Sequence, residues 1–377
     1  MSARTPILEV SHLSVDYLGE GGMTHAVSDV SLTVRRGEIL GLAGESGSGK
    51  STLAYAITRL LRPPAAISGG EARYYGRTTD EAGYAVAAEP VDILRLKPSE
   101  LRAVRWSEIA IVFQSAMNAL NPTMTVGAQV LDVLATHRRE MPAAKRRERA
   151  SELFELVGIS PERLKSYPHE LSGGMRQRAI IAIALALSPE LIIMDEPTTA
   201  LDVVVQREIL TELLRLREQL DLSIIFITHD LSLLLELADT IAIMYAGRLV
   251  EATSARELHT HPLHPYSYGM LHSFPSLHGA RRLMTGIPGS PPDLRAVPSG
   301  CAFHPRCPLA YAPCARFVPA LLPLTGAGSA SSVACHRYDP AHAEGMAPPT
   351  TAEMAERYAA LADSPSESPT ESGRTPV

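Results

Sequence analysis

The sequence predicts an α/β protein in which helices cover both faces of a parallel β-sheet. Three short apolar runs, at 191–194, 223–227 and 241–244, indicate strands that are buried on both faces. Helical stretches separate these runs, and strands that alternate with helices are typical of a parallel sheet. A glycine-rich loop at 44–51, placed between an apolar strand and a helix, points to the same fold class.

The N-terminal part is expected to contain strands and one helix. Apolar and polar residues alternate over 7–17 and 26–34, which indicates two strands joined by a turn at 19–22. Residues 38–43 form a short apolar strand, and a helix is expected over about 51–61.

The composition and the periodicity of the sequence change twice after this helix. Residues 63–98 contain scattered glycines and are expected to be a looser region, whereas 128–165 and 180–187 have helical character. From about Pro262 prolines become frequent and periodicity weakens. Residues 340–377 are rich in Pro, Ser, Thr, Ala and Glu and are taken to lack large apolar residues, so we predict a disordered tail.

The composition limits the class of protein. The chain has 377 residues, 45% of them hydrophobic, which suits one large domain or two modest ones. The net charge of −6 argues against a nucleic-acid partner, because such proteins carry basic surfaces. The longest apolar stretch, at 179–187, is much shorter than the about 20 residues that cross a bilayer, and the start does not resemble a signal peptide. We therefore expect a cytosolic protein that acts at a membrane only as a peripheral partner.

Residues 44–51 fit the phosphate-loop pattern G-x-x-x-x-G-K-[ST]. Glycines let consecutive backbone N–H groups turn toward phosphates, where a Cβ would clash, and the helix N-terminus adds positive potential. Lys50 is expected to reach the β- and γ-phosphates, and the Ser51 hydroxyl is expected to bind Mg²⁺. The sequence thus predicts a nucleoside triphosphate site made of Gly44, Glu45, Ser46, Gly47, Ser48, Gly49, Lys50, Ser51 and Thr52.

Two adjacent acids end the apolar strand at 191–194. Because neighbouring residues of a strand point to opposite faces, Asp195 and Glu196 can have different roles. Asp195 suits Mg²⁺, and Glu196 is then free to orient and deprotonate the attacking water. Such pairs are common at strand ends, but beside a phosphate loop this one indicates metal binding and catalysis.

Residues 171–178, Leu-Ser-Gly-Gly-Met-Arg-Gln-Arg, closely resemble the signature motif of ABC ATPases, L-S-G-G-Q, with Met175 where glutamine is usual. Ser172, Gly173 and Gly174 would begin a helix and offer hydrogen-bond donors and a positive dipole end to a phosphate. In that family the motif faces the phosphate loop of a second ATPase domain, so each ATP is held between two subunits. The resemblance covers nearly the whole chain, to about residue 337.

The other motifs of the family follow in order. Gln114 matches the Q-loop, where a carboxamide can touch Mg²⁺ and the attacking water. Asp202 matches the D-loop, which crosses to the partner subunit, and His229 matches the switch histidine, which contacts the γ-phosphate and helps to hold Glu196. Tyr17 resembles the aromatic residue that stacks on adenine, although a tyrosine in a strand can also serve packing alone.

Three features resemble the ATPases of oligopeptide, dipeptide and nickel importers. Residues 118–126 follow the Q-loop, in the segment that contacts the permease in such transporters, and 261–267 are similar to the family's H-P-Y-T element. The third feature is the cysteine-containing stretch at 300–336. The resemblance implies a P-loop NTPase core of the ABC ATPase type at 1–260, with a small antiparallel β subdomain, a helical subdomain at about 115–178, and a C-terminal extension at 261–339.

The spacing of the four cysteines does not by itself distinguish zinc from an iron–sulfur cluster. A disulfide framework is not expected in a reducing cytosol. In peptide-importer ATPases this pattern is associated with an iron–sulfur cluster, so the resemblance implies a 4Fe–4S cluster with a structural role, and Zn²⁺ or unliganded thiols are the alternatives. The expected ligands are Cys301, Cys307, Cys314 and Cys335.

The resemblance implies a subunit that binds and hydrolyses ATP to power peptide import at the cytoplasmic face of the cell membrane. The expected partners are a second ATPase subunit, more often a related chain than a copy, two membrane permease subunits and an extracytoplasmic substrate-binding protein. Catalysis would depend on Glu196 and His229, with Mg²⁺ held by Ser51, Gln114 and Asp195. Import of nickel chelates or another small solute, and a soluble ABC ATPase outside transport, remain alternatives.

Overall fold

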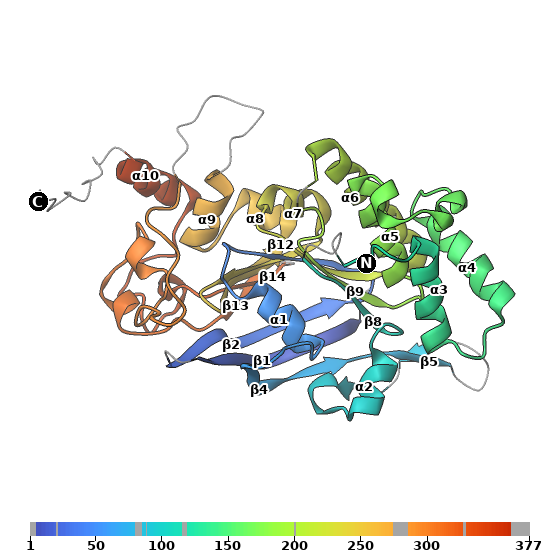
Figure 1. Cartoon of the computed structure of the whole chain (residues 1–377). Helices are drawn as coiled ribbons and strands as arrows, with labels where there is room; N and C mark the ends of the chain where they lie inside the picture. Colours follow the sequence, from blue (N-terminus) through green and yellow to red (C-terminus); the bar gives the residue numbers. More distant parts are fainter. Residues whose placement is uncertain are drawn as a thin grey trace, which may run out of the picture.

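The computed structural model describes residues 5–19, 22–79, 85–87, 89–114, 119–199, 201–273, 286–326 and 329–362. Over these ranges the chain folds around a large mixed sheet and a smaller antiparallel sheet, with a group of helices on the far side of the large one (Figure 1). No helix in this part of the chain is long and apolar enough to cross a lipid bilayer.

The large sheet contains the predicted parallel core. Its strands lie in the order β13, β14, β12, β11, β3, β10, β9 and β8, and the strands from β11 to β8 are parallel. The α/β prediction is therefore confirmed, and the three apolar runs are β9, β10 and β11. The bounds are β13 (Leu322–Gly326), β14 (Ser329–Val333), β12 (Arg248–Ser254), β11 (Thr240–Tyr245), β3 (Ile39–Ala43), β10 (Ser223–Ile227), β9 (Leu191–Asp195) and β8 (Ile109–Val112).

Alternate side chains of the central strands face two different cores. In β3, Ile39 and Ala43 pack with the helices on one side of the sheet, whereas Leu40 and Leu42 face the small sheet and α1 (Lys50–Ile57) on the other. All four are buried, which explains why this strand carries an unbroken apolar run rather than an alternating one.

The small sheet contains a strand that the sequence did not predict. Its order is β2 (Gly22–Arg35), β1 (Pro6–Gly19), β4 (Ala65–Tyr74) and β7 (Val91–Asp92), all antiparallel. The expectation of a looser region at 63–98 was wrong, because β4 lies within it and pairs along β1.

Glycine in β4 concealed the strand. Gly70 has a φ of 98°, and a Cβ there would lie 2.5 Å from the Cα of Leu13. The pairing of β1 with β4 is also irregular between Ser11 and Ser14, so the glycine marks an irregular pairing with close backbone approach rather than the end of a strand.

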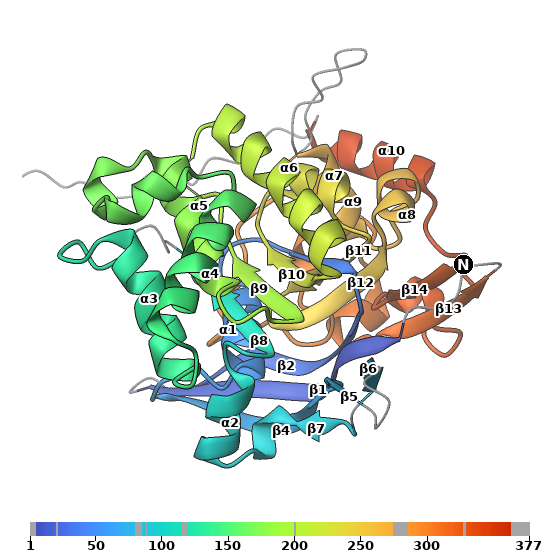
Figure 2. The same ribbon diagram turned by 90° about the vertical axis from the view of Figure 1, so that its right-hand side faces the viewer.

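Helices cover the other face of the large sheet (Figure 2). The predicted helical stretch at 128–165 is interrupted, since it contains two α-helices and a 3₁₀ turn, η3 (Pro161–Lys165). Residues 115–118, where the predicted helical subdomain and permease-contacting segment begin, lie outside the described residues. The helices are α3 (Val126–His137), α4 (Ala143–Leu156), α5 (Gly173–Ala184), α6 (Val203–Leu220), α7 (Leu231–Leu237) and α8 (Ala255–Thr260), and the short α2 (Pro98–Val104) lies beside the small sheet.

The C-terminal part is joined to the large sheet. β14 pairs antiparallel with β12, so strands from both sides of the expected boundary at 260 share one sheet. That boundary stays a prediction.

The prediction of a disordered tail at 340–377 was wrong for its described part. α10 (Thr351–Ala362) packs against α9 (Pro265–His272) (Figure 1). Met354 and Tyr358 of α10 are fully buried. The prediction considered only the average composition of this stretch and so overlooked these two large apolar side chains. They lie one helical turn apart and form the face of α10 that contacts α9. Residues 363–377 lie outside the described residues.

Replacing Tyr358 by alanine is expected to lower the free energy of unfolding by about 3–5 kcal/mol, because it leaves a large cavity under α10. Tyr358 is 1% exposed and its hydroxyl donates to the Pro265 carbonyl oxygen at 2.9 Å. Tyr358→Phe removes only that hydrogen bond and should cost about 1 kcal/mol. Urea denaturation curves would measure both values, and a change below about 0.5 kcal/mol for Tyr358→Ala would mean that the helix is not packed as described.

Candidate active site

The phosphate loop connects β3 to α1 in a form that only glycine permits at two positions. Gly44 has a φ of 148°, and a Cβ there would lie 2.3 Å from the carbonyl oxygen of Met244. Gly49 has a φ of 100°, and its Cβ would lie 2.3 Å from the carbonyl oxygen of Ala26. The two ends of the loop are therefore held against neighbouring backbone, as the glycine pattern predicts.

Lys50 lies inside this loop and holds it in shape. Its Nζ donates to the carbonyl oxygens of Gly44 (2.8 Å) and Glu45 (2.9 Å) and to Ser48 Oγ (3.3 Å). The side chain is buried, and burial lowers the pKa of Lys50 although nearby carboxylates oppose the shift. Phosphate oxygens would be stronger, charged acceptors for the same ammonium group.

Asp195 and Ser51 form a pair suited to a divalent cation. Ser51 Oγ donates to Asp195 Oδ1 at 3.0 Å, and Asp195 is fully buried at the end of β9. Burial raises the pKa of Asp195, and its Oδ2 has no hydrogen-bond partner among the described residues. A hard cation such as Mg²⁺ takes oxygen ligands of this kind, so the hydroxyl and the free carboxylate oxygen fit the predicted metal.

Glu196 is the centre of a polar cluster. Gln114 Nε2 donates to Glu196 Oε2 at 3.2 Å, and His229 Nδ1 lies 3.2 Å from Glu196 Oε1. Thr199 Oγ1 also donates to Oε2, at 3.1 Å. Glu196 has a φ of 47°, a backbone form that non-glycine residues rarely adopt. Its carboxylate is thus turned to meet side chains from three different segments.

Glu196, Gln114 and His229 line one cavity of about 440 Å³. Its walls bring together the phosphate loop, the Q-loop glutamine, the catalytic glutamate and the switch histidine that the sequence predicted. Three residues from the C-terminal part complete the wall, a contribution that the sequence did not predict. The lining residues are Glu45, Ser46, Gln114, Glu196, His229, Met270, Ser273 and Ile287.

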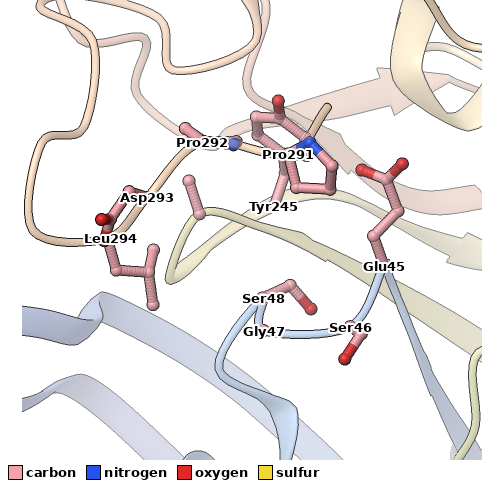
Figure 3. Close-up of a pocket in the computed structure, with 10 residues that line it drawn as sticks. Glu45, Ser46, Gly47, Ser48, Tyr245, Pro291, Pro292, Asp293 and Leu294 are labelled. Carbon is pink, nitrogen blue, oxygen red and sulfur yellow. The ribbon is translucent and has the colours of Figure 1, made fainter. Parts of the chain in front are cut away.

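A second cavity, of about 270 Å³, lies over the other side of the loop. Figure 3 shows the loop residues 45–48 at its floor and Tyr245 above them, with Pro291 and Pro292 from the C-terminal part facing the loop. The phosphate loop is therefore flanked by the C-terminal part at both cavities.

The signature motif lies elsewhere in the structure. Ser172 caps α5, and its Oγ accepts from the Met175 N–H at 3.2 Å. The other N–H groups of the first turn have no partner within the helix, and such groups are the ones that a helix start offers to an anion. Gly174 packs so closely on α6 that a Cβ would lie 2.6 Å from Val205. Among the described residues, no member of the motif lines the cavity that holds Glu196. The motif and the phosphate loop of one chain are thus not assembled into one site.

Asp202 and Tyr17, for which the sequence suggested a partner and adenine, have contacts only within the chain among the described residues. Asp202 caps α6 by accepting from the N–H groups of Val204 (3.1 Å) and Val205 (3.0 Å). The first two residues of this helix, Val203 and Val204, are 71% and 69% exposed. Tyr17 is half-buried, and its hydroxyl lies 3.4 Å from Thr52 Oγ1 in α1. Their roles toward a partner and toward adenine stay predictions.

Three contributions to the site were missed. Tyr55 lies one turn after Ser51 on α1, and burial together with the Asp195 carboxylate raises its pKa to about 12. That i, i+4 spacing was a usable signal. Thr199 could have been suspected from its place three residues after Glu196. No local pattern predicted that Tyr266 and Arg306 of the C-terminal part form hydrogen bonds with Glu45.

Comparisons with known proteins agree with this geometry. Residues 27–199 match the family described as ABC transporter, and residues 250–314 match the oligopeptide/dipeptide transporter C-terminal region. The oligopeptide transport ATP-binding protein OppD of Salmonella typhimurium is 43% identical over 310 residues, which cover 82% of this chain and 88% of that protein. This chain belongs to the ABC transporter family of ATP-binding proteins.

Other relatives and solved structures support the same assignment. The dipeptide transport ATP-binding protein DppD of Caldanaerobacter subterraneus is 40% identical over 334 residues, which cover 88% of this ABC ATPase and 97% of DppD. The dimeric, post-hydrolysis ATP-binding cassette MJ0796 bound to ADP and Pi aligns with a TM-score of 0.56 and 27% identity, over 66% of this chain and 99% of that chain. The cbiO1 subunit of the Clostridium perfringens cbiONQ complex aligns with a TM-score of 0.54 and 29% identity, over 67% and 90%.

The four cysteines of this ABC ATPase line one enclosed cavity. All four are free thiols, and burial raises the pKa of Cys301 to about 11 and that of Cys335 to about 12. Burial also raises the pKa of Cys307 and Cys314. The four cysteines therefore lie around one space, but among the described residues no three of their sulfur atoms lie within 4.8 Å of one another. A metal bound by these thiols stays a prediction.

Glu251 in β12 is a buried carboxyl group that is expected to make the stability of the ABC ATPase depend on pH. It is fully buried and accepts from the N–H groups of Leu263 (3.0 Å) and His264 (2.7 Å), and burial raises its pKa from 4.5 to about 7. The folded state therefore holds this proton more tightly, so the contribution of Glu251 to stability is lost as pH rises from about 4.5 to about 7.

Glu251→Gln is expected to remove this dependence. The free energy of unfolding of the variant, relative to the wild type, should increase by about 3 kcal/mol between pH 4.5 and 7. The buried His264, whose pKa burial lowers to about 3, acts in the opposite direction but equally in both proteins. Urea denaturation at several pH values measures the difference, and a constant difference would mean that Glu251 does not titrate in this range.

Proposed function

We propose that this chain is the ATP-hydrolysing subunit of a peptide importer and acts at the cytoplasmic face of a membrane. The observation that carries the proposal is the cavity in which Gln114, Glu196 and His229 meet the phosphate loop, with a wall from the C-terminal part. The match of residues 250–314 to the oligopeptide/dipeptide transporter C-terminal region, together with relatives named for peptide transport, supports peptides as cargo.

The residues around the cavity have different roles in ATP hydrolysis. The backbone N–H groups of the loop and Lys50 would bind the phosphates of ATP. Ser51 and Asp195 would hold Mg²⁺, which would neutralise phosphate charge. Glu196 accepts a proton from the attacking water, and His229 and Gln114 keep its carboxylate oriented through their contacts with Oε1 and Oε2.

The separation of the signature motif from the cavity supports a paired ATPase. Ser172, Gly173, Gly174 and Met175 of one subunit would contact the ATP held by the phosphate loop of the other, and Asp202 would lie at the same junction. We infer that the partner is a related chain rather than a copy, that the pair drives two permease subunits, and that a substrate-binding protein outside the membrane delivers the cargo.

Uptake in cells that carry Glu196→Gln at the chromosomal locus tests the cargo. Accumulation of a labelled tripeptide should fall to the background of a deletion strain and return when the wild-type chain is supplied. Accumulation of a labelled nickel chelate, measured in parallel, should not change. Loss of nickel uptake with normal peptide uptake would show that the cargo is a nickel chelate rather than a peptide. No effect on either uptake would favour a different small solute or a role outside transport.

We further propose that the cysteine-lined cavity holds a 4Fe–4S cluster rather than zinc. The support is the convergence of Cys301, Cys307, Cys314 and Cys335 from separate turns of a proline-rich segment, which a bound metal would hold together. Protein purified without oxygen should contain about four iron and four sulfide per chain. One zinc per chain and no iron would assign the alternative, and Cys314→Ser should abolish either signal.

A further inference from the structure

Glu45, the second residue of the phosphate loop, forms a bidentate ion pair with Arg306 of the C-terminal part. The Nη1 and Nη2 groups of Arg306 donate to Oε2 and Oε1 of Glu45 at 2.7 and 2.9 Å. The arginine side chain is 7% exposed and the glutamate 27%, so the pair is largely shielded from water. Such a fork-to-carboxylate pair fixes both direction and charge.

The backbone of Glu45 is held from the same side. Its N–H donates to the hydroxyl oxygen of Tyr266 at 2.9 Å, and Tyr266 is fully buried in α9. The ring of Tyr266 packs on those of Tyr245 and Phe303, with centroids 4.6 and 5.2 Å away. Lys50 already holds the Glu45 carbonyl oxygen, so every polar group of this residue is fixed.

Arg306 is itself fixed by its surroundings. Its Nε donates to the Pro288 carbonyl oxygen at 2.7 Å, and its guanidinium lies 5.8 Å from the centroid of the Tyr245 ring. It ends the 3₁₀ turn η5 (His304–Arg306), directly before Cys307, and the turn begins with a hydrogen bond from the His304 N–H to the Cys301 carbonyl oxygen. The segment that carries two of the cavity cysteines therefore also carries the partner of the phosphate loop.

The ion pair of Glu45 and Arg306 affects the charge that the phosphate loop presents to ATP. Glu45 lines the cavity where the negatively charged phosphates of ATP would lie, and an unpaired carboxylate there would repel them through a partly desolvated space. Arg306 neutralises that carboxylate and holds it toward the C-terminal part. Without Arg306 the loop would present a negative charge to its own ligand.

We propose that Arg306 is a positioning residue for the ATP site, which acts through Glu45 and makes ATP affinity depend on the segment bearing Cys301 and Cys307. The proposal rests on the proposed ATP site but not on the identity of the cargo. Direct measurement of ATP binding therefore tests it separately from transport.

The first test measures binding of a fluorescent ATP analogue with Mg²⁺ to the purified full chain. Arg306→Gln should weaken binding by about tenfold or more, because the carboxylate is left unpaired beside the phosphates. Adding Glu45→Gln to Arg306→Gln should recover most of the loss, which a purely structural role of Arg306 would not allow. Arg306→Lys should lie in between, because it keeps the charge and loses the fork.

Steady-state kinetics separate positioning from catalysis. Arg306→Gln should raise the KM for ATP while kcat stays within about threefold, since Glu196 and its partners are untouched. The exposed Arg256 on α8 offers a matched control, and Arg256→Gln should bind ATP as the wild type does. If the double variant binds no better than Arg306→Gln, or if Arg306→Gln binds normally, the charge argument is overturned.

A double-mutant cycle tests the dependence on the cysteine segment. Cys335→Ser alters the cavity from a position far from Arg306 in sequence. It should weaken ATP binding in the wild-type chain and add little in the Arg306→Gln chain, because both changes act through the same ion pair. Equal effects in the two backgrounds would show that the cysteine cavity does not act through Arg306, and circular dichroism would confirm that each variant is folded.

Discussion

Replacing Glu196 by glutamine is expected to lower the rate of ATP hydrolysis by about 100-fold or more. The amide keeps the shape of the side chain but cannot accept a proton from water. In the variant the amide oxygen can accept from Gln114 Nε2, and the amide nitrogen can donate to an unprotonated Nδ1 of His229, so the cavity should remain intact. ATP binding should persist, because the phosphates are held by the loop and by Lys50.

Retained ATP without hydrolysis should also favour the closed pair of subunits. Size-exclusion chromatography with the partner subunit and MgATP would measure this, next to a phosphate-release assay for turnover. The exposed Glu218 on α6 provides a matched control, and Glu218→Gln should hydrolyse ATP at the wild-type rate. Normal turnover of Glu196→Gln would exclude Glu196 as the base.

Replacing Lys50 by alanine is expected to weaken ATP binding by about 100-fold, since the ammonium group supplies charge-assisted hydrogen bonds to phosphate oxygens. The effect should exceed that of any other single change in the loop, because Lys50 also holds the loop closed through Gly44, Glu45 and Ser48. Isothermal titration calorimetry with MgATP gives the affinity directly.

The comparison for Lys50→Ala is the exposed Lys145 on α4. Lys145→Ala should bind ATP normally, and thermal melting should show that Lys50→Ala remains folded. Binding of ATP within about threefold of the wild type in a folded Lys50→Ala protein would contradict the assigned role of the ammonium group.

Local patterns predicted those parts of the fold and site that local chemistry determines. The phosphate loop needs glycine at Gly44 and Gly49 because neighbouring backbone approaches closely there. The glycine spacing within a short stretch of sequence was therefore enough to predict the loop. The same holds for the acids that end β9, because a strand end and a neighbouring loop suffice to give them roles. Strands β9, β10 and β11 were predictable because burial on both faces leaves an unbroken apolar run.

The features that were missed depend on distant partners. β4 carries two adjacent glycines, and only its pairing with β1 makes it a strand. α10 lies in a tail rich in Pro, Ser, Thr, Ala and Glu, and Tyr358 becomes a core residue only against α9. Arg306 is separated from Glu45 by 261 positions, so no pattern in either segment indicates their contact.

The pairing of β14 with β12 bears on how the protein is made. β12 ends at Ser254, whereas its neighbour β14 begins only at Ser329. During synthesis the outer edge of β12 therefore stays uncovered until more of the chain has emerged, and uncovered edge strands invite association between molecules. Fragments that stop within that interval should aggregate, while the complete chain should stay monodisperse. The C-terminal part would then protect the protein from aggregation in addition to lining the site.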